Sequence, residues 1–186
     1  MRNVLAVGLM IVAAGAACAD PVTGKVARKM LFLGKAVEVE FLADSPLAAD
    51  QQVVLGLVAE GQPYYGAIAI SPDEGLMSEA TVAAANHHDV DAAQAAALAD
   101  CNARKTGAAK CVVVALIRPA GWQPRDLQLS AAATAAFKAD YKAKGSAVAV
   151  SPATGAWGMG QGDGAAEAAV TACAVTAKDC ALAIAD

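Results

Sequence analysis

A phrase of nine residues occurs twice in this chain, and this repetition limits the possible folds more than any other feature. The first copy reads Ala-Ile-Ala-Ile-Ser-Pro-Asp-Glu-Gly from Ala67 to Gly75, and the second reads Ala-Val-Ala-Val-Ser-Pro-Ala-Thr-Gly from Ala147 to Gly155. Each copy continues through an alanine-rich segment to two cysteines. Self-similarity of this kind indicates a supersecondary unit that recurs within the chain. We therefore expect an internal duplication.

Each copy predicts a hairpin of two strands. Alanine alternates with isoleucine or valine up to a Ser-Pro pair, and this alternation is typical of a strand. The proline and the glycine three positions after it are typical of a tight turn. We expect the second strand at residues 76–82 in the first copy and at residues 156–160 in the second.

A helix and a third strand follow in each copy. The alanine-rich stretches 91–101 and 163–173 each begin with aspartate and end with cysteine. We expect Asp91 and Asp163 as N-caps, because a carboxylate there accepts hydrogen bonds from the free amides of the first turn. The next cysteine of each copy opens an apolar run. The sequence therefore predicts an α+β protein of two strand-strand-helix-strand repeats, with helices packed on an antiparallel or mixed sheet.

The chain outside the repeats predicts one strand and two helices. Residues 36–42 alternate apolar and acidic side chains, which indicates a half-buried strand, and residues 48–59 favour a helix. Residues 130–142 predict a linking helix with Ser130 as N-cap. The expected organisation is a signal peptide at 1–19, an N-terminal segment at 20–65, the first repeat at 66–119, a linking loop and helix at 120–144 and the second repeat at 145–186.

The N-terminus has the pattern of a secretory signal peptide. Arg2 supplies a positive charge, an apolar run extends from Val4 to Val12, and small residues surround Cys18. We expect cleavage near Ala19 and a periplasmic or secreted protein without a membrane span, with lipoprotein anchoring through Cys18 as the alternative. Residues from Asp20 to about Lys29 are expected to have little fixed structure at the new terminus.

Removal of the signal peptide leaves four of the five cysteines. An even number of cysteines in an oxidising compartment favours two disulfides. Four cysteines allow three pairings, but a repeated unit is expected to contain its own crosslink, which favours Cys101 with Cys111 and Cys173 with Cys180. A redox-active pair is not expected, because no Cys-X-X-Cys spacing occurs, and the spacings fit no common zinc site.

Both histidines of the protein lie beside carboxylates, just before the helix of the first copy. The candidate metal ligands of this segment are His87, His88, Asp89 and Asp91. Imidazole and carboxylate groups bind divalent cations, so a metal-dependent hydrolase is the alternative function. The positive end of a helix disfavours a cation, however, and the aspartates equally suit helix capping.

The composition and motifs exclude several classes of function. The net charge is −4 and no basic cluster occurs, so nucleic acid and anionic membrane surfaces are not expected partners. The glycine-rich run 158–164 lacks the spacing of a phosphate-binding loop. No Ser-His-Asp or Cys-His set can be assembled, and we expect no catalytic residue and no cofactor. Tyr64 and Tyr65 form the main aromatic cluster and are expected to fill a core or an interface, with a binding platform as the alternative.

The second copy resembles a secreted bacterial family catalogued as domain of unknown function 4189. The matching residues are Ser151, Pro152, Gly155, Trp157, Gly158, Cys173, Asp179 and Cys180. The first copy departs from the pattern at Leu76 and Met77. The resemblance covers both copies and implies an exported, cysteine-paired protein without established chemistry.

Chains of this type in alphaproteobacteria sometimes carry the name 5-aminolevulinate synthase. That activity requires a Schiff-base lysine, a phosphate cup and an acidic partner for the pyridoxal ring within a much larger fold, so the residues argue against the label. The sequence predicts instead an exported, non-enzymatic, disulfide-stabilised protein that binds a protein or a cell-envelope component.

Overall fold

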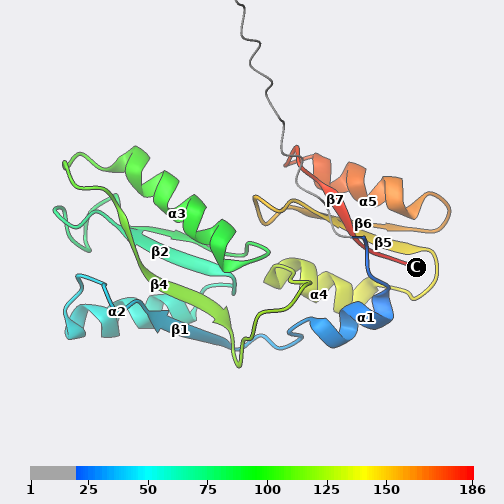
Figure 1. Ribbon diagram of the computed structural model, residues 1–186, viewed down its shortest axis with the longest axis horizontal. Coiled ribbons are helices and arrows are strands. Elements are labelled where there is room, and N and C mark those ends of the chain that lie inside the picture. Colours follow the sequence, from blue (N-terminus) through cyan, green and yellow to red (C-terminus); the bar gives the residue numbers. More distant parts are fainter. Residues whose placement is uncertain (1–19) are drawn as a thin grey trace, which may run out of the picture.

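The computed structural model describes residues 20–186, so the signal-peptide and lipoprotein predictions, which fall on residues 1–19, lie outside the described residues. Five helices and seven strands follow one another in this range (Figure 1). In chain order they are α1 (Gly24–Met30), β1 (Val37–Phe41), α2 (Ala49–Glu60), β2 (Gly66–Ile70), β3 (Val82–Ala84), α3 (Val90–Arg104), β4 (Val112–Pro119), α4 (Ala131–Asp140), β5 (Ser146–Val150), β6 (Trp157–Gln161), α5 (Ala165–Ala174) and β7 (Ala181–Ala185).

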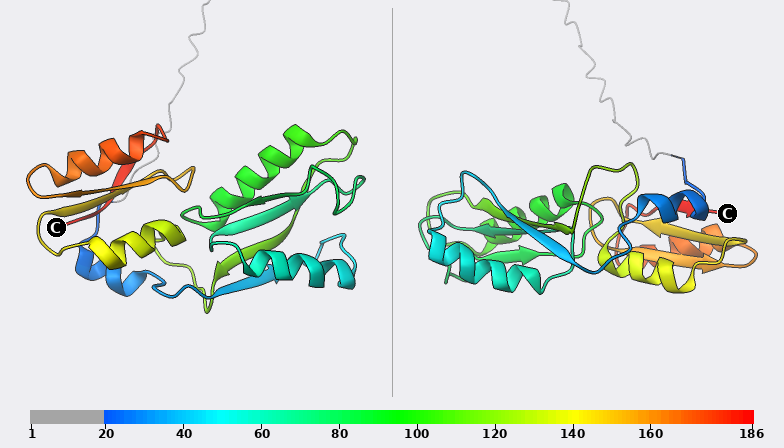
Figure 2. Two further views of the ribbon diagram at one scale, coloured as in Figure 1. Left: turned by 180° about the vertical axis from the view of Figure 1, so that it is seen from behind. Right: turned by 90° about the horizontal axis from the view of Figure 1, so that it is seen from below.

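The strands form two sheets, and each sheet is the centre of one structural unit. The first unit has four strands in the order β1-β4-β2-β3, and the second has three in the order β6-β5-β7. All pairs between these strands are antiparallel. The two units lie side by side (Figures 1 and 2). The predicted α+β class, with helices packed on sheets, is confirmed.

The two units share their order of elements and their strand arrangement. The first strand of each repeat, β2 or β5, is central, with its hairpin partner on one side and the third strand on the other. The pairing with the third strand shifts register at corresponding places, between Ile68 and Ala69 in the first unit and between Val148 and Ala149 in the second. An extra residue there bends the strand. The origin of the units by duplication stays a prediction.

The correspondence extends to a helix that the sequence analysis left outside both repeats. Loops of five residues, 61–65 and 141–145, separate the helices α2 and α4 from the central strands that follow them. The last loop residue has a positive φ in both units, 53° at Tyr65 and 63° at Gly145. Each unit is therefore a sheet between helices: α2 and α3 flank the first sheet, and α5 lies opposite α4 and α1 on the second (Figure 1).

The prediction of little fixed structure from Asp20 to Lys29 is wrong, because these residues contain most of α1. Thr23 caps this helix, and Ala27 is fully buried in the core of the second unit. Val22 pairs with Ile184 and exchanges backbone hydrogen bonds with Ala183 and Ala185 at 3.0 Å. These long-range contacts, which no local pattern encodes, fix the segment.

The second strand of the first copy is β3, at residues 82–84, and the prediction of residues 76–82 is wrong. The intervening residues form turns instead: the amide of Ser78 donates to the carbonyl of Gly75, and the Thr81 hydroxyl donates to the carbonyl of Leu76 at 2.8 Å. Serine and threonine favour such local bonds over a strand ladder. The strand of the second copy, β6, agrees with its prediction to within one residue.

The two predicted N-caps Asp91 and Asp163 are also wrong, by two residues and by one. Asp89 caps α3, with its carboxylate accepting from the amide of Ala92 at 2.7 Å. Gly164 is the N-cap of α5 and has a φ of 77°, a conformation that glycine adopts without strain. The N-cap Ser130 of α4 is as predicted.

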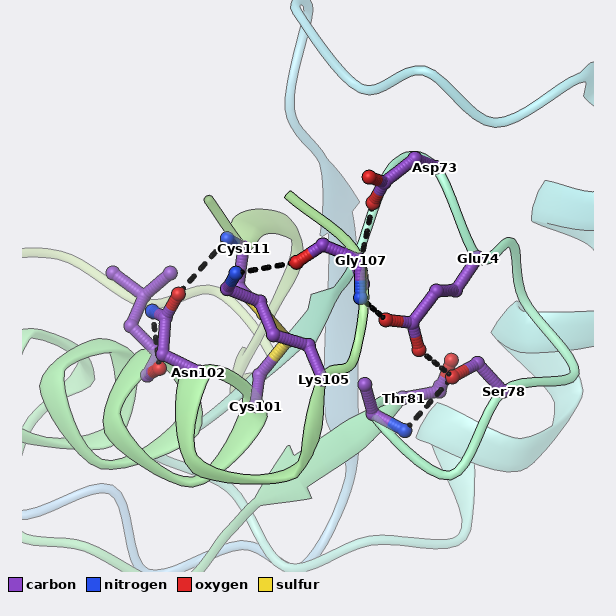
Figure 3. The surroundings of a disulfide bond; sticks show 12 residues. Asp73, Glu74, Ser78, Thr81, Cys101, Asn102, Lys105, Gly107 and Cys111 are labelled. Atoms are coloured by element: carbon purple, nitrogen blue, oxygen red, sulfur yellow. Dashed lines mark hydrogen bonds between the residues drawn. A yellow bond between two sulfur atoms is a disulfide. The ribbon is translucent and has the colours of Figure 1, made fainter. Parts of the chain in front are cut away.

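The disulfides join Cys101 to Cys111 and Cys173 to Cys180, which are the predicted pairs. Each disulfide ties the end of a helix to the residue before the third strand. Figure 3 shows the disulfide between Cys101 and Cys111. Cys101 and Cys173 are fully buried, so the crosslinks belong to the core of their units.

A carboxylate near each disulfide ties the Ser-Pro turn to the loop between the cysteines. In the second unit Asp179 accepts from the hydroxyl of Ser151 at 2.6 Å. In the first unit the carboxylate comes from the turn itself, since Asp73 accepts from the hydroxyl of Ser71 at 2.9 Å and from the amide of Ala109 at 3.1 Å. Hydrogen bonds to the charged form lower the pKa of both carboxyl groups. The carboxylate that connects turn and loop thus comes from the turn in the first unit and from the loop between the cysteines in the second.

Candidate functional site

A cavity of about 700 Å³ lies between the two units, and we call it the junction groove. Its walls come from the segment before β1, from the end of α2 with the following loop, and from one face of α4. The lining residues are Leu33, Gly34, Lys35, Glu60, Gly61, Gln62, Pro63, Tyr64, Ala131, Thr134, Ala135, Lys138 and Ala139. Its volume lies in the range of small-molecule sites.

Helix α4 forms one wall of the junction groove because its two faces differ. The lining positions recur every three or four residues, so they share one side of the helix. The other side carries Ala133 and Phe137, which are fully buried against the second sheet. The groove face is mostly alanine, whose small side chain leaves open volume.

The side chain of Tyr64 lines the junction groove and is fixed in place by its neighbours. This side chain is 3% exposed, and its hydroxyl donates to the carbonyl of Phe32 at 3.0 Å. Its ring meets that of Tyr65 edge to face at a centroid distance of 5.2 Å. Burial raises the pKa of Tyr64, so the phenol stays neutral at physiological pH. The tyrosine pair therefore fills the interface, as expected from the sequence.

Three charged side chains line the junction groove: Lys35, Glu60 and Lys138. The remaining lining residues are glycine, apolar residues and the uncharged polar residues Gln62, Tyr64 and Thr134. Two ammonium groups against one carboxylate leave a positive balance in a protein that is acidic overall. A mostly apolar site with a few placed charges can hold a ligand that combines an apolar body with an acidic group.

His88 joins the two units beside this groove. Its side chain is 4% exposed and lies between the N-terminus of α4 and the hairpin of the second unit. The amide of Ser130 donates to Nδ1 at 2.9 Å, so Nδ1 carries no proton. Nε2 then carries it and donates to the carbonyl of Ala156 at 2.8 Å. One neutral imidazole thus bridges three segments.

Asn86 reinforces the same junction. Its side-chain oxygen accepts from the amide of Ala132 at 2.9 Å, and its backbone has a φ of 64°. The backbone of Gly155 lies so close that a Cβ there would be 2.0 Å from the carbonyl oxygen of Asn86. The loop that carries the histidines therefore positions the start of α4, and with it one wall of the junction groove.

The stability of the junction is expected to fall as pH decreases. Burial lowers the pKa of His88, since the charged form would lose its hydration. In the unfolded chain His88 takes up a proton near pH 6.5, whereas in the folded chain it does so only at lower pH. The contribution of His88 to stability is therefore present above pH 6.5 and is lost as the pH falls below it. Protonation would also set two donors, Nδ1–H and the Ser130 amide, against each other.

Urea unfolding at pH 7, 6 and 5 measures this effect, with His88→Asn as the non-titrating control. The difference in free energy of unfolding between the wild type and His88→Asn should decrease by up to about 2 kcal/mol from pH 7 to pH 5. Parallel pH profiles for the two proteins would contradict the prediction.

The four candidate metal ligands do not come together as a metal site. Both ring nitrogens of His88 are occupied, Asp89 caps α3, and Asp91 accepts from the side chain of Gln94 at 3.1 Å. Within residues 20–186, no group of three or more histidine, cysteine or acidic side chains is placed to hold a metal ion. Of the four, His88 instead bridges the two units.

Sequence reasoning missed the junction groove and identified only Tyr64 among its residues. The lining residues are ordinary alanines, lysines and loop residues from three distant segments, and no spacing marks them as a set. Between the serine of the repeated phrase and the aspartate before the helix, the first copy is eight residues longer than the second. This extra length carries the histidines and was a usable signal for the junction, because it breaks the symmetry of the copies.

No protein-family model, curated protein or solved structure matches this chain. The resemblance to the family of domain of unknown function 4189 therefore stays a prediction. No helix among the described residues has the length and apolar character needed to cross a membrane.

Proposed function

We propose that this chain is an exported binding protein that holds a ligand in the junction groove. This proposal rests on the cavity of about 700 Å³ between the two units, each of which has its own internal disulfide. Sites of this kind are typically concave, mostly apolar and found between structural units. A binding role needs no catalytic set, and the site residues found here supply walls and charges.

Export is supported by the two disulfides and by the signal-peptide pattern of residues 1–19. The periplasm or the exterior would allow the disulfides to form and persist. The resemblance to the family of domain of unknown function 4189, which stays a prediction, would imply the same location.

We assign the ligand to the class of amphiphiles with an apolar body and an acidic group, as found among cell-envelope components. The alanine face of α4 and the side chains of Leu33 and Pro63 would contact the apolar body. Lys35 and Lys138 would attract the acidic group, while burial of the apolar body would supply most of the affinity.

Titration with the fluorescent amphiphile 1-anilinonaphthalene-8-sulfonate tests this site, because the probe combines aromatic rings with an acidic group. Ala135→Trp should weaken binding at least tenfold by filling the groove. Ala95→Trp is the matched control, since Ala95 is exposed on α3 and does not line the groove. Equal binding by the wild type and both variants would contradict the proposal.

A further inference from the structure

The strand β1 forms an open edge of the first sheet. Within residues 20–186 it pairs with β4 alone. The flanking ladder bonds run from the amide of Ala120 to the carbonyl of Ala36 and from the amide of Leu42 to the carbonyl of Val114, both at 3.0 Å. Figure 2 shows no other element along the outer side of this strand.

These two bonds determine which backbone groups of β1 are free. Hydrogen-bonded and non-hydrogen-bonded positions alternate in an antiparallel pair. Since residues 36 and 42 bond to the β4 side, the even-numbered positions face β4. The odd-numbered residues Val37, Val39 and Phe41 therefore direct their amides and carbonyls to the open side. An added strand could bond to all three.

A second cavity of about 430 Å³, the edge groove, runs between this edge and α2. Val39 and Phe41 line it from the strand, and Val53, Gly56 and Leu57 line it from the helix. Val53 is 67% exposed and Leu57 is 70% exposed. Apolar side chains of an added strand would cover these residues, because alternate side chains of a strand point to the same face.

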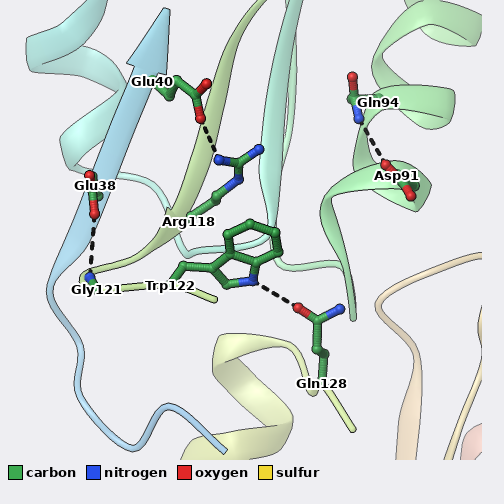
Figure 4. Close-up of polar contacts among 8 residues, drawn as sticks. All are labelled: Glu38, Glu40, Asp91, Gln94, Arg118, Gly121, Trp122 and Gln128. Atoms are coloured by element: carbon green, nitrogen blue, oxygen red, sulfur yellow. Dashed lines mark hydrogen bonds and ion pairs between the residues drawn. The ribbon is translucent and has the colours of Figure 1, made fainter. Parts of the chain in front are cut away.

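The opposite face of β1 is acidic. Glu38 and Glu40 are exposed there, with Glu40 paired to Arg118 and Glu38 accepting from the amide of Gly121 at 3.3 Å (Figure 4). Cross-strand partners of like charge repel. A second copy pairing antiparallel about Val39 would place each Glu38 opposite a Glu40, so the edge disfavours self-association. A basic side chain would instead meet the carboxylate of Glu38, which forms no ion pair among the described residues.

We propose that the β1 edge and the edge groove form a strand-addition site for an extended protein segment in which apolar residues alternate with lysine or arginine. The backbone of the segment pairs with Val37, Val39 and Phe41. Its apolar side chains enter the edge groove, and its basic side chains lie along the acidic face. This binding is independent of the ligand proposed for the junction groove, although Glu60 lines both cavities.

The test uses the mature chain and the peptide acetyl-Lys-Val-Lys-Val-Lys-Val-Lys-amide. Fluorescence anisotropy should show saturable binding of this peptide, at least tenfold tighter than binding of the same peptide with glutamate in place of lysine. Amide hydrogen exchange should slow at Val37, Val39 and Phe41 on addition of the basic peptide. Slowing confined to other elements, or equal binding of both peptides, would overturn the proposal.

Two matched substitutions separate backbone pairing from other effects. Val39→Pro removes one outward amide while leaving the bonds to β4, and it should weaken peptide binding about tenfold relative to Val39→Ala, which keeps the amide. Glu38→Lys, at an exposed site, should reverse the preference between basic and acidic peptides and covers the case in which the proline variant does not fold.

Self-association of the wild type through β1 would also overturn the proposal, and light scattering measures it. Probe binding in the junction groove should be unchanged by Val39→Ala and Glu38→Lys, so failure of one site is distinguishable from failure of the other.

Discussion

Replacement of all four paired cysteines by alanine is expected to remove about 5 kcal/mol of stability. The disulfides close loops of 10 and 7 residues, and the chain-entropy relation gives about 2–3 kcal/mol for each. A small domain has only about 5–15 kcal/mol in total. The alanine-rich core has little apolar area to compensate, so the four-cysteine variant should be largely unfolded at 37 °C. Alanine is preferred to serine because Cys101 and Cys173 are fully buried.

Thermal and urea unfolding of the two single-pair variants measure the separate contributions. The pairs lie in different units, so the two losses should add to within about 0.5 kcal/mol. Peptide mapping without reduction supplies the covalent control. A link from Cys101 to Cys173 or Cys180, or a four-cysteine variant as stable as the wild type, would contradict this prediction.

The substitution Gly160→Ala is expected to destabilise the second unit by about 3 kcal/mol. The helix α5 lies directly on the backbone of β6, and a Cβ at Gly160 would be 1.9 Å from the carbonyl oxygen of Ala165. A Cβ at Gly158 would similarly be 2.2 Å from the carbonyl oxygen of Ala169. Both neighbours are helix backbone, so the helix must move away from the sheet and lose its packing.

Gly34→Ala is the matched control, because a Cβ at Gly34 has no atom within 4 Å. Urea unfolding should place the control within about 0.5 kcal/mol of the wild type. Hydrogen exchange should locate the loss caused by Gly160→Ala in α5 and β6. A Gly160→Ala protein as stable as the Gly34→Ala control would contradict the prediction.

The glycine-rich run shows how far a motif can be interpreted from sequence. Its spacing predicts no phosphate binding, but its role as the contact surface of α5 depends on how closely that helix approaches. The distance between α5 and the sheet depends on contacts between residues that lie far apart in the chain. The missed caps have a similar cause: Asp89 and Asp91 are both suitable residues, and only the position of α3 against its sheet selects Asp89.

The histidine segment shows the same limit for the candidate site. The residue types suggested metal ligands, whereas the structure uses His88 to bridge Ser130 and Ala156, which lie 42 and 68 positions away in the chain. Both partners bond to His88 through backbone groups, the amide of Ser130 and the carbonyl of Ala156. A pattern of side-chain types cannot reveal backbone partners.

The sequence by itself determined the order of the repeated elements, the disulfide pairs and the N-cap of α4, because these depend on periodicity and spacing within short stretches. Only the tertiary structure decided that α1 and α4 cover the second sheet, that His88 joins the units, and that a groove and an open strand edge remain. These features arise where segments distant in the chain meet. Local patterns constrain the conformation of each segment, while the choice of neighbour depends on the shapes and charges of complete surfaces.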